Sequence, residues 1–255
     1  AEFAVHTLPT QTAGSIIRPA SFTGVWGFKP SFGLIPSTGM LKTTDSLDTV
    51  GFFVGHTADL PHTLDALRGH GRDFPLSHAA FEDRTRQGAP IGRPWRVAVV
   101  RPPVWRHAPD YAVWAFDRWL KQLGGDARYE IVEAALARQV ELARQMDRFL
   151  RGFDAMLTLS TAGEAPLRHI EEAPDSALMW TLTQLPSLNA PVFVSPRGLP
   201  FGLQLVARRY NDPLLLRFVD EAIERGHLPA TSYGRTCGSA ASAAVRLPQD
   251  DVLGA

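Results

Sequence analysis

The sequence predicts an α/β protein in which helices cover a layered sheet. Short apolar runs typical of buried strands alternate along the chain with longer amphipathic segments, and such an alternation produces a layered sheet. At 255 residues, of which 45% are hydrophobic, the chain can build a sizeable core as one large domain or two small ones. The sequence contains no internal repeat.

The first elements follow from apolar runs and from the residues that break them. We expect a short helix or turn over residues 14–24 and a strand from Val25 to Lys29. Pro30, Gly33 and Pro36 then impose loops.

The next stretch predicts two strands with a helix and a polar loop between them. The expected elements are a buried strand from Val50 to Val54, a helix capped by Thr57 that ends near Leu67, a polar loop containing Gly71, Pro75, Gly88, Pro90 and Pro94, and a strand from Arg96 to Val100.

The remaining residues continue the alternation. Pro109 opens a helix that Gly124 closes, with an apolar stripe that includes Phe116 and Trp119. The other expected elements are an amphipathic helix over 133–150, a strand from Ala155 to Leu159, a helix from Ser176 to Leu185, strands from Val192 to Ser195 and from Gly202 to Ala207, and a helix from Asp212 to Arg225. The Ala, Ser and Gly content of residues 231–255 predicts a disordered tail after a domain that spans residues 1–230.

Charge and composition exclude several classes of partner. With 26 basic and 26 acidic residues, the chain has no overall positive field to attract nucleic acid or a membrane surface. No apolar run approaches the roughly 20 residues that span a bilayer, and the first residues lack the basic-then-apolar pattern of a signal sequence. The single cysteine, Cys237, forms no internal disulfide, which fits a cytoplasmic location.

The run from Thr10 to Ala20 carries the clearest chemistry. Ser15 follows the small residues Ala13 and Gly14 and precedes a stretch that can begin a helix. The backbone N–H groups of Thr12, Ala13, Gly14 and Ser15 could converge there on a substrate carbonyl oxygen and stabilise developing negative charge. The same residues are also compatible with a Gly-Ser turn that only caps a helix.

Several motifs in order resemble the amidase signature family of serine hydrolases. They are Thr10 to Ala20, Gly24 to Pro30, Gly33 to Pro36, Ser46 to Gly51, Phe153 to Thr158 and Gly198 to Val206, within a resemblance over roughly residues 8–226. The resemblance implies a mixed β-sheet flanked by helices and hydrolysis of small carboxamides, or of esters, without a cofactor. It also implies that Ser15 is the nucleophile and that Thr12 to Ser15 form the oxyanion hole.

The family's other catalytic groups have no counterpart in this sequence. The family uses a Ser–Ser–Lys triad whose lysine and bridging serine lie upstream of the nucleophile, whereas Lys29, Lys42 and Lys121 all follow Ser15. The chain therefore resembles the C-terminal part of an amidase catalytic domain. Two interpretations stay open. One is an amidase-type hydrolase that is incomplete in this chain and needs an N-terminal segment or a dimer partner. The other is a non-catalytic chain, either a truncated product or one half of a split enzyme.

Other residues are candidates near the site. Arg18 is expected in a structural ion pair, with Asp48 as its partner by resemblance, or in anion binding. By resemblance, Trp180, Met179 and Thr158 line the acyl pocket, although plain helix packing explains Trp180 and Met179 equally well. The histidines do not cluster, so we expect no metal site.

Two departures from the family pattern affect the predicted site. Pro9 stands where the family usually has glycine, and Ser160 and Thr161 stand where related sequences often have proline. Because proline fixes φ and removes an N–H group, the approach to the oxyanion hole and the shape of the pocket are expected to differ.

Overall fold

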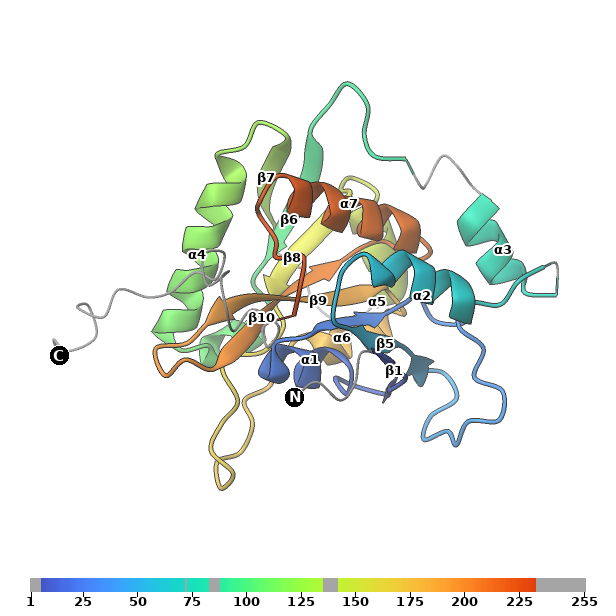
Figure 1. Ribbon diagram of the computed structural model, residues 1–255, viewed down its shortest axis with the longest axis horizontal. Helices are drawn as coiled ribbons and strands as arrows, with labels where there is room; N and C mark the ends of the chain where they lie inside the picture. Colours follow the sequence, from blue (N-terminus) through green and yellow to red (C-terminus); the bar gives the residue numbers. More distant parts are fainter. Residues whose placement is uncertain (1–5, 72, 83–87, 135–141, 233–255) are drawn as a thin grey trace, which may run out of the picture.

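The computed structural model of the protein describes residues 6–71, 73–82, 88–134 and 142–232 (Figure 1). An eight-stranded sheet forms its centre. In spatial order the strands are β1 (His6–Thr7), β5 (Phe52–Val54), β3 (Trp26–Lys29), β9 (Ser187–Val194), β10 (Pro200–Val206), β8 (Ala155–Leu159), β6 (Trp95–Val100) and β7 (Tyr129–Ala134). Neighbouring strands are antiparallel except that β6 runs parallel to both β7 and β8. The mixed sheet confirms the predicted fold class.

Helices cover both faces of the sheet (Figure 1). The larger hydrophobic cluster joins one face to α2 (Asp59–Leu67), α4 (Asp110–Gly124) and α7 (Asp212–Glu224). A smaller cluster joins the opposite face to α5 (Leu142–Leu150) and α6 (Ala177–Leu182). Helix α1 (Ile17–Thr23) packs on β3, β9 and β10, α3 (Pro75–Glu82) packs on α7, and a short 3₁₀ helix, η2 (Pro103–His107), follows β6.

The two faces of the sheet differ in chemistry. Gly27, Asn189, Gln204 and Thr158 are paired in register across β3, β9, β10 and β8, so these four positions lie on one face of the sheet. Ala20 of α1 lies against Gly27, which shows that this is the face covered by α1. The chain therefore buries a polar row beneath α1 and α6 and keeps its main apolar core on the other side.

Helix α1 lies close to the sheet because a glycine leaves room for it. A Cβ atom at Gly27 would lie 2.5 Å from the Cβ atom of Ala20. Ser21 of α1 fixes the contact: its hydroxyl oxygen accepts a hydrogen bond from Gly202 N–H (2.8 Å) and lies 2.7 Å from the Thr161 hydroxyl. The sheet thus determines the place of α1, and with it the turn that precedes α1.

We expect Gly27→Ala to lower the free energy of unfolding by about 1–3 kcal/mol, because the added methyl group overpacks the contact with α1. The urea midpoint at unchanged slope measures this loss. Gly88→Ala is the control, since nothing lies within 4 Å of a Cβ atom at Gly88. Equal midpoints for the two variants would contradict the role given to Gly27.

The predicted strand from Val50 to Val54 is divided in two. Thr49–Val50 form β4, which pairs with β2 (Thr10–Gln11) in a separate two-stranded sheet, while β5 joins the main sheet. Gly51 lies between β4 and β5. It passes so close to β3 that a Cβ atom at this position would lie 2.3 Å from the Phe28 carbonyl oxygen.

The predicted cap of the next helix is also wrong. Helix α2 begins at Asp59, and the hydroxyl of Thr57 donates instead to the Ala230 carbonyl (3.2 Å). Helix α3 lies within the predicted polar loop. Thr57 bonds to Ala230 and α3 packs on α7, so contacts with segments far along the chain decide both features.

The predicted helix over 133–150 and the elements after it change in length. Residues 129–134 form the edge strand β7, residues 135–141 lie outside the described residues, and α5 begins at Leu142. Helix α6 ends at Leu182, before Gln184 takes a positive φ of 61°, and β9 already begins at Ser187. In the predicted tail, Ser232 is buried and donates to the Val54 carbonyl (3.0 Å), whereas residues 233–255 lie outside the described residues.

Candidate active site

Ser15 lies in the turn that links β2 to α1. It is exposed, while its neighbours Gly14 and Ile16 are buried. Its hydroxyl makes no hydrogen bond within the described ranges of the chain. The turn therefore presents one serine side chain to solvent at the start of a helix.

The backbone around Ser15 offers hydrogen-bond donors. The backbone N–H groups of Thr12, Ala13, Gly14 and Ser15 donate to no group in the part of the chain that the structure describes. The next N–H groups, those of Ile16 and Ile17, donate to the Gln11 side chain at 2.8 and 3.0 Å. The unused donors precede or include Ser15, where an oxyanion would need them.

Asp48 supports the turn from the side of β4. It accepts hydrogen bonds from the hydroxyl of Thr12 and from the N–H groups of Thr43 and Thr44. The hydrogen bond from Thr12 is the main cause that lowers the pKa of the Asp48 carboxyl group, followed by that from Thr44. Asp48 is thus a charged anchor for the residue that begins the predicted oxyanion hole.

Arg18 does not pair with Asp48, which corrects the expected partner. Its guanidinium binds Asp175 (2.6 Å) and Glu172 (2.9 Å). The Asp175 side chain is only 3% exposed, so this ion pair is largely buried on one side. A Cβ atom at Gly14 would lie 3.2 Å from Arg18 Nη2, so the guanidinium lies against the Ser15 turn. Asp48 is engaged by Thr12, and the loop before α6 brings Asp175 to Arg18 instead.

Two residues to which the sequence assigns no role contact the turn. Gln11 is fully buried and Thr181 of α6 is almost so. The Gln11 Nε2 group donates to the Thr181 hydroxyl (2.8 Å), and that hydroxyl lies 2.9 Å from the Ala13 carbonyl oxygen. A glutamine within the motif is the only local signal, because its partner lies 170 positions away.

The expected pocket residues lie in the interior rather than at a surface. Trp180 and Thr158 are fully buried, and Met179 is half-buried. The indole N–H of Trp180 donates to Gln204 Oε1 (3.0 Å), and Thr158 accepts from the indole N–H of Trp105 (2.9 Å). Their lining of an acyl pocket stays a prediction.

A narrow crevice lies beside these residues. Its volume is about 10 Å³, which is room for about one water molecule. It is lined by Val104, Trp105, Ala108, Leu159, Thr161, Ala162, Pro174, Asp175 and Ser176. The crevice meets the Arg18 ion pair through Asp175. The Thr161 hydroxyl donates to the Gly163 carbonyl (2.8 Å) and so shapes this wall.

Lys29 is buried away from solvent. Its ammonium group donates to the carbonyls of Leu185 (2.5 Å) and Pro30 (3.2 Å). Burial lowers the pKa of Lys29 to about 7, against the opposing attraction of Asp212. These bonds direct Nζ to backbone carbonyls rather than to Ser15.

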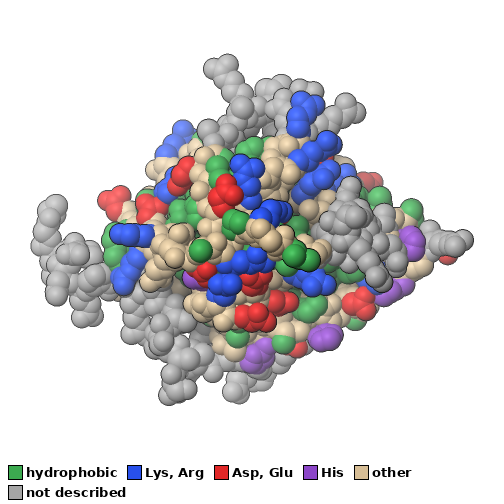
Figure 2. Space-filling view, turned by 90° about the horizontal axis from the view of Figure 1, so that it is seen from above, with side chains coloured by type: hydrophobic (Ala, Val, Ile, Leu, Met, Phe, Trp, Pro, Cys, Tyr) green, Lys and Arg blue, Asp and Glu red, His purple; other side chains and the backbone are tan. Residues whose placement is uncertain are grey.

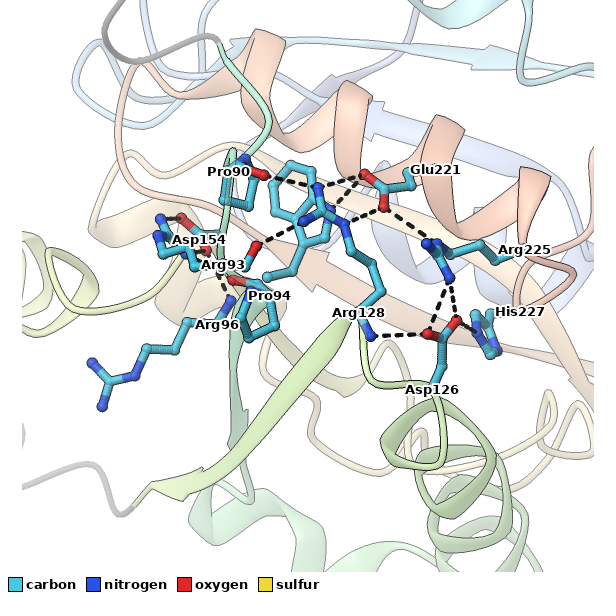
Figure 3. A network of polar contacts seen from close by, with 11 residues as sticks. Pro90, Arg93, Pro94, Arg96, Asp126, Arg128, Asp154, Glu221, Arg225 and His227 are labelled. Atoms are coloured by element: carbon cyan, nitrogen blue, oxygen red, sulfur yellow. Dashed lines mark hydrogen bonds and ion pairs between the residues drawn. The ribbon is translucent and has the colours of Figure 1, made fainter.

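The most connected ion-pair network lies elsewhere, between α7 and the strands β6 and β7 (Figure 3). Arg128 binds Glu221, and Arg225 links Glu221 to Asp126, which also binds His227 (3.0 Å). Each charge faces an opposite one, so the network is a structural tie.

An open cavity of about 480 Å³ beside this network is lined mainly by charged residues of α7. Basic and acidic side chains are mixed over the face seen in Figure 2.

Two other kinds of feature are absent from the part of the chain that the structure describes. It contains no group of three His, Cys, Asp or Glu residues that could hold a metal ion. None of its helices combines the length and apolarity needed to cross a membrane.

Comparisons with known proteins agree with this fold. The family model described as Amidase matches residues 1–144. One subunit of the glutamyl-tRNA(Gln) amidotransferase of Heliobacterium modesticaldum is 37% identical over 98 residues, which are 38% of this chain and 20% of that protein. The peptide amidase of Stenotrophomonas maltophilia has a similar structure, with a TM-score of 0.70 and 19% identity over 91% of this chain and 64% of that one.

A second similar structure belongs to a vestigial protein complex that reveals the origins of an s-triazine catabolic enzyme. Its TM-score is 0.66 at 20% identity, over 89% of this chain and 64% of that one. This chain thus spans less than two thirds of the length of each of these proteins. Because the family model covers more than half of its 255 residues, the chain belongs to the Amidase family.

Proposed function

We propose that this chain serves in the hydrolysis of carbon–nitrogen bonds of small carboxamides, with Ser15 as nucleophile. The observation that carries the proposal is the exposed Ser15 beside backbone N–H groups that donate to nothing within the described residues. Membership of the Amidase family supports the same reaction class. Thr12, Ala13, Gly14 and Ser15 form the proposed oxyanion hole.

In the proposed reaction, Ser15 Oγ attacks the amide carbonyl carbon while a base takes the hydroxyl proton. The C–O bond forms, and the carbonyl oxygen becomes an oxyanion that the N–H groups of the turn stabilise. Collapse breaks the C–N bond, and the proton passes to the leaving amine. Water then attacks the acyl-enzyme and releases the acid. An ester enters the same sequence with an alcohol as leaving group.

The base is proposed to come from outside the described residues. Lys29 donates to Leu185 and Pro30, and Lys42 forms an ion pair with Asp45 (3.2 Å). A lysine-bearing N-terminal segment or a protein partner would supply the base. One relative is named as part of an amidotransferase with several subunits and one similar structure as a protein complex, which supports a partner. We place this activity in the cytoplasm.

A non-catalytic role is the second candidate. It is favoured by a different observation: among the described residues, no lysine ammonium group bonds to the Ser15 hydroxyl. Such a chain would keep the turn and the fold but would not react with acylating or phosphonylating reagents.

Labelling with a serine-directed fluorophosphonate, carried out with the family's lysine-bearing segment co-expressed, separates the two candidates. We expect one label per chain, mapped to Ser15 by peptide mass spectrometry, and none in Ser15→Ala. Ser46→Ala is the matched control because Ser46 is also exposed. A label that persists in Ser15→Ala would remove Ser15 from its role.

A further inference from the structure

We propose that Gln11 and Thr181 are positioning residues that aim the backbone N–H groups of the Ser15 turn. The inference rests on the proposed function of Ser15. It starts from a clamp on both sides of the turn: Thr181 holds the Ala13 carbonyl before Ser15, and Gln11 holds the N–H groups of Ile16 and Ile17 after it.

The clamp is buried and its bonds are mutually consistent. Gln11 Oε1 accepts the two backbone N–H groups, so its Nε2 must face the other way, where Thr181 Oγ1 accepts it at 2.8 Å. The single hydrogen of the Thr181 hydroxyl is then left for a carbonyl. The Ala13 oxygen lies at 2.9 Å and the Ala177 oxygen, in the same helix, at 3.1 Å.

Peptide geometry converts these bonds into a direction for the donors. In a planar trans peptide, the C=O group of one residue and the N–H group of the next point in opposite directions. Since the Ala13 carbonyl points to Thr181, the Gly14 N–H points away from α6. The Gly14 carbonyl accepts from Arg18 N–H (2.9 Å), so the Ser15 N–H points away from α1. Both N–H groups are thereby left free of the helices.

A backbone hydrogen bond at Pro9 fixes the strand from which Gln11 extends. Pro9 supplies no N–H group, but its carbonyl accepts from Gly51 N–H (3.0 Å) and so ties the strand β2 to β4. Gln11 at the end of β2 therefore starts from a fixed backbone. The orientation of the turn is transmitted from β2 to α1 and α6 through one glutamine side chain.

The first experiment measures the rate constant for fluorophosphonate labelling of Ser15 in Thr181 variants, each co-expressed with the family's lysine-bearing segment. Thr181→Val keeps the shape but releases the Ala13 carbonyl, and we expect labelling about 10- to 100-fold slower. Thr181→Ser should restore most of the rate. Thr183→Val is the matched control, because the Thr183 hydroxyl is also buried yet bonds only to carbonyls of its own helix, those of Met179 and Trp180. It should change the melting temperature without slowing the labelling.

The second experiment does not depend on serine reactivity. Hydrogen exchange of Ile16 and Ile17 amides is compared between the unsubstituted chain and Gln11→Met, and we expect about fivefold faster exchange when the acceptor is lost. Unchanged exchange, or labelling of Thr181→Val as fast as that of Thr183→Val, would overturn the clamp. Failure of the unsubstituted chain to label at Ser15 while the lysine-bearing segment is present would instead overturn the proposed function, and the exchange result would still decide whether the clamp exists.

Discussion

The purified 255-residue chain is expected to hydrolyse an anilide or an ester slowly, and a segment that supplies a lysine and a bridging serine is expected to raise the rate by about 10²–10⁴-fold. The reason is that a serine hydroxyl is a poor nucleophile without an adjacent base. An oxyanion hole and binding alone leave a residual acceleration of about 10³ over water. The measurement is steady-state turnover with and without the family's lysine-bearing segment, co-expressed with this chain.

Two variants make the result specific to the site. Ser15→Ala should remove the gain, and Ser46→Ala, at another exposed serine, should keep it. Lys29→Met tests whether the buried lysine takes part. Turnover of the chain alone near one per second, abolished by both Ser15→Ala and Lys29→Met while the fold is retained, would show a self-sufficient Ser–Lys enzyme and sink the proposal.

The second large effect concerns stability. We expect Lys29→Met and Asp212→Ala each to lower the free energy of unfolding by about 3–5 kcal/mol, because each leaves a buried polar or charged partner uncompensated. Asp212 is fully buried at the start of α7 and accepts from the Ser31 N–H (2.7 Å) and hydroxyl (2.6 Å). Ser31 follows β3 by two residues, so the pair ties the sheet to α7.

A double-variant cycle checks this interpretation. The charges of Lys29 and Asp212 act on each other, so the double variant should lose less stability than the two single variants together. Urea denaturation supplies the three free energies. Strict additivity would show that the two residues act separately, through Leu185 and Ser31.

The same residues predict a pH dependence. Burial lowers the pKa of Lys29 to about 7, from an ordinary value near 10.5. The folded protein therefore binds the proton of Lys29 more weakly than the unfolded chain does. The stability that it contributes is complete above pH 10.5 and is lost as the pH falls to 7. The pKa of Asp212 is raised to about 6 by burial, from 3.8, so its contribution is complete below 3.8 and is lost as the pH rises to 6.

The unfolding free energy of the unsubstituted chain, followed from about pH 7 to about pH 10, should therefore rise relative to that of Lys29→Met. Parallel curves over this range would contradict the lowered pKa of the buried Lys29. Asp212→Asn keeps a side-chain acceptor for Ser31 but cannot lose a proton. Between about pH 4 and about pH 6, the unfolding free energy of the unsubstituted chain should therefore fall relative to that of Asp212→Asn.

Local patterns were sufficient for the elements that bear the site. The strand at Val25 to Lys29 and the helix after Ser15 were predictable, because apolar periodicity and breaking residues act over a few positions. The ordered motifs around Ser15 were sufficient for the family as well. The errors at Thr57 and at the divided strand of Val50 to Val54 come from contacts with Ala230 and Phe28, which no local pattern contains.

The sequence by itself determined the fold class, the family and the place of the serine turn. Tertiary structure alone decided what surrounds that turn: Gln11 meets Thr181 across 170 positions, Arg18 meets Asp175 rather than Asp48, and Lys29 is buried against Leu185. The physical reason is that strand order brings β2, α1 and α6 together, and a polar side chain bonds to whichever group the packing places within reach.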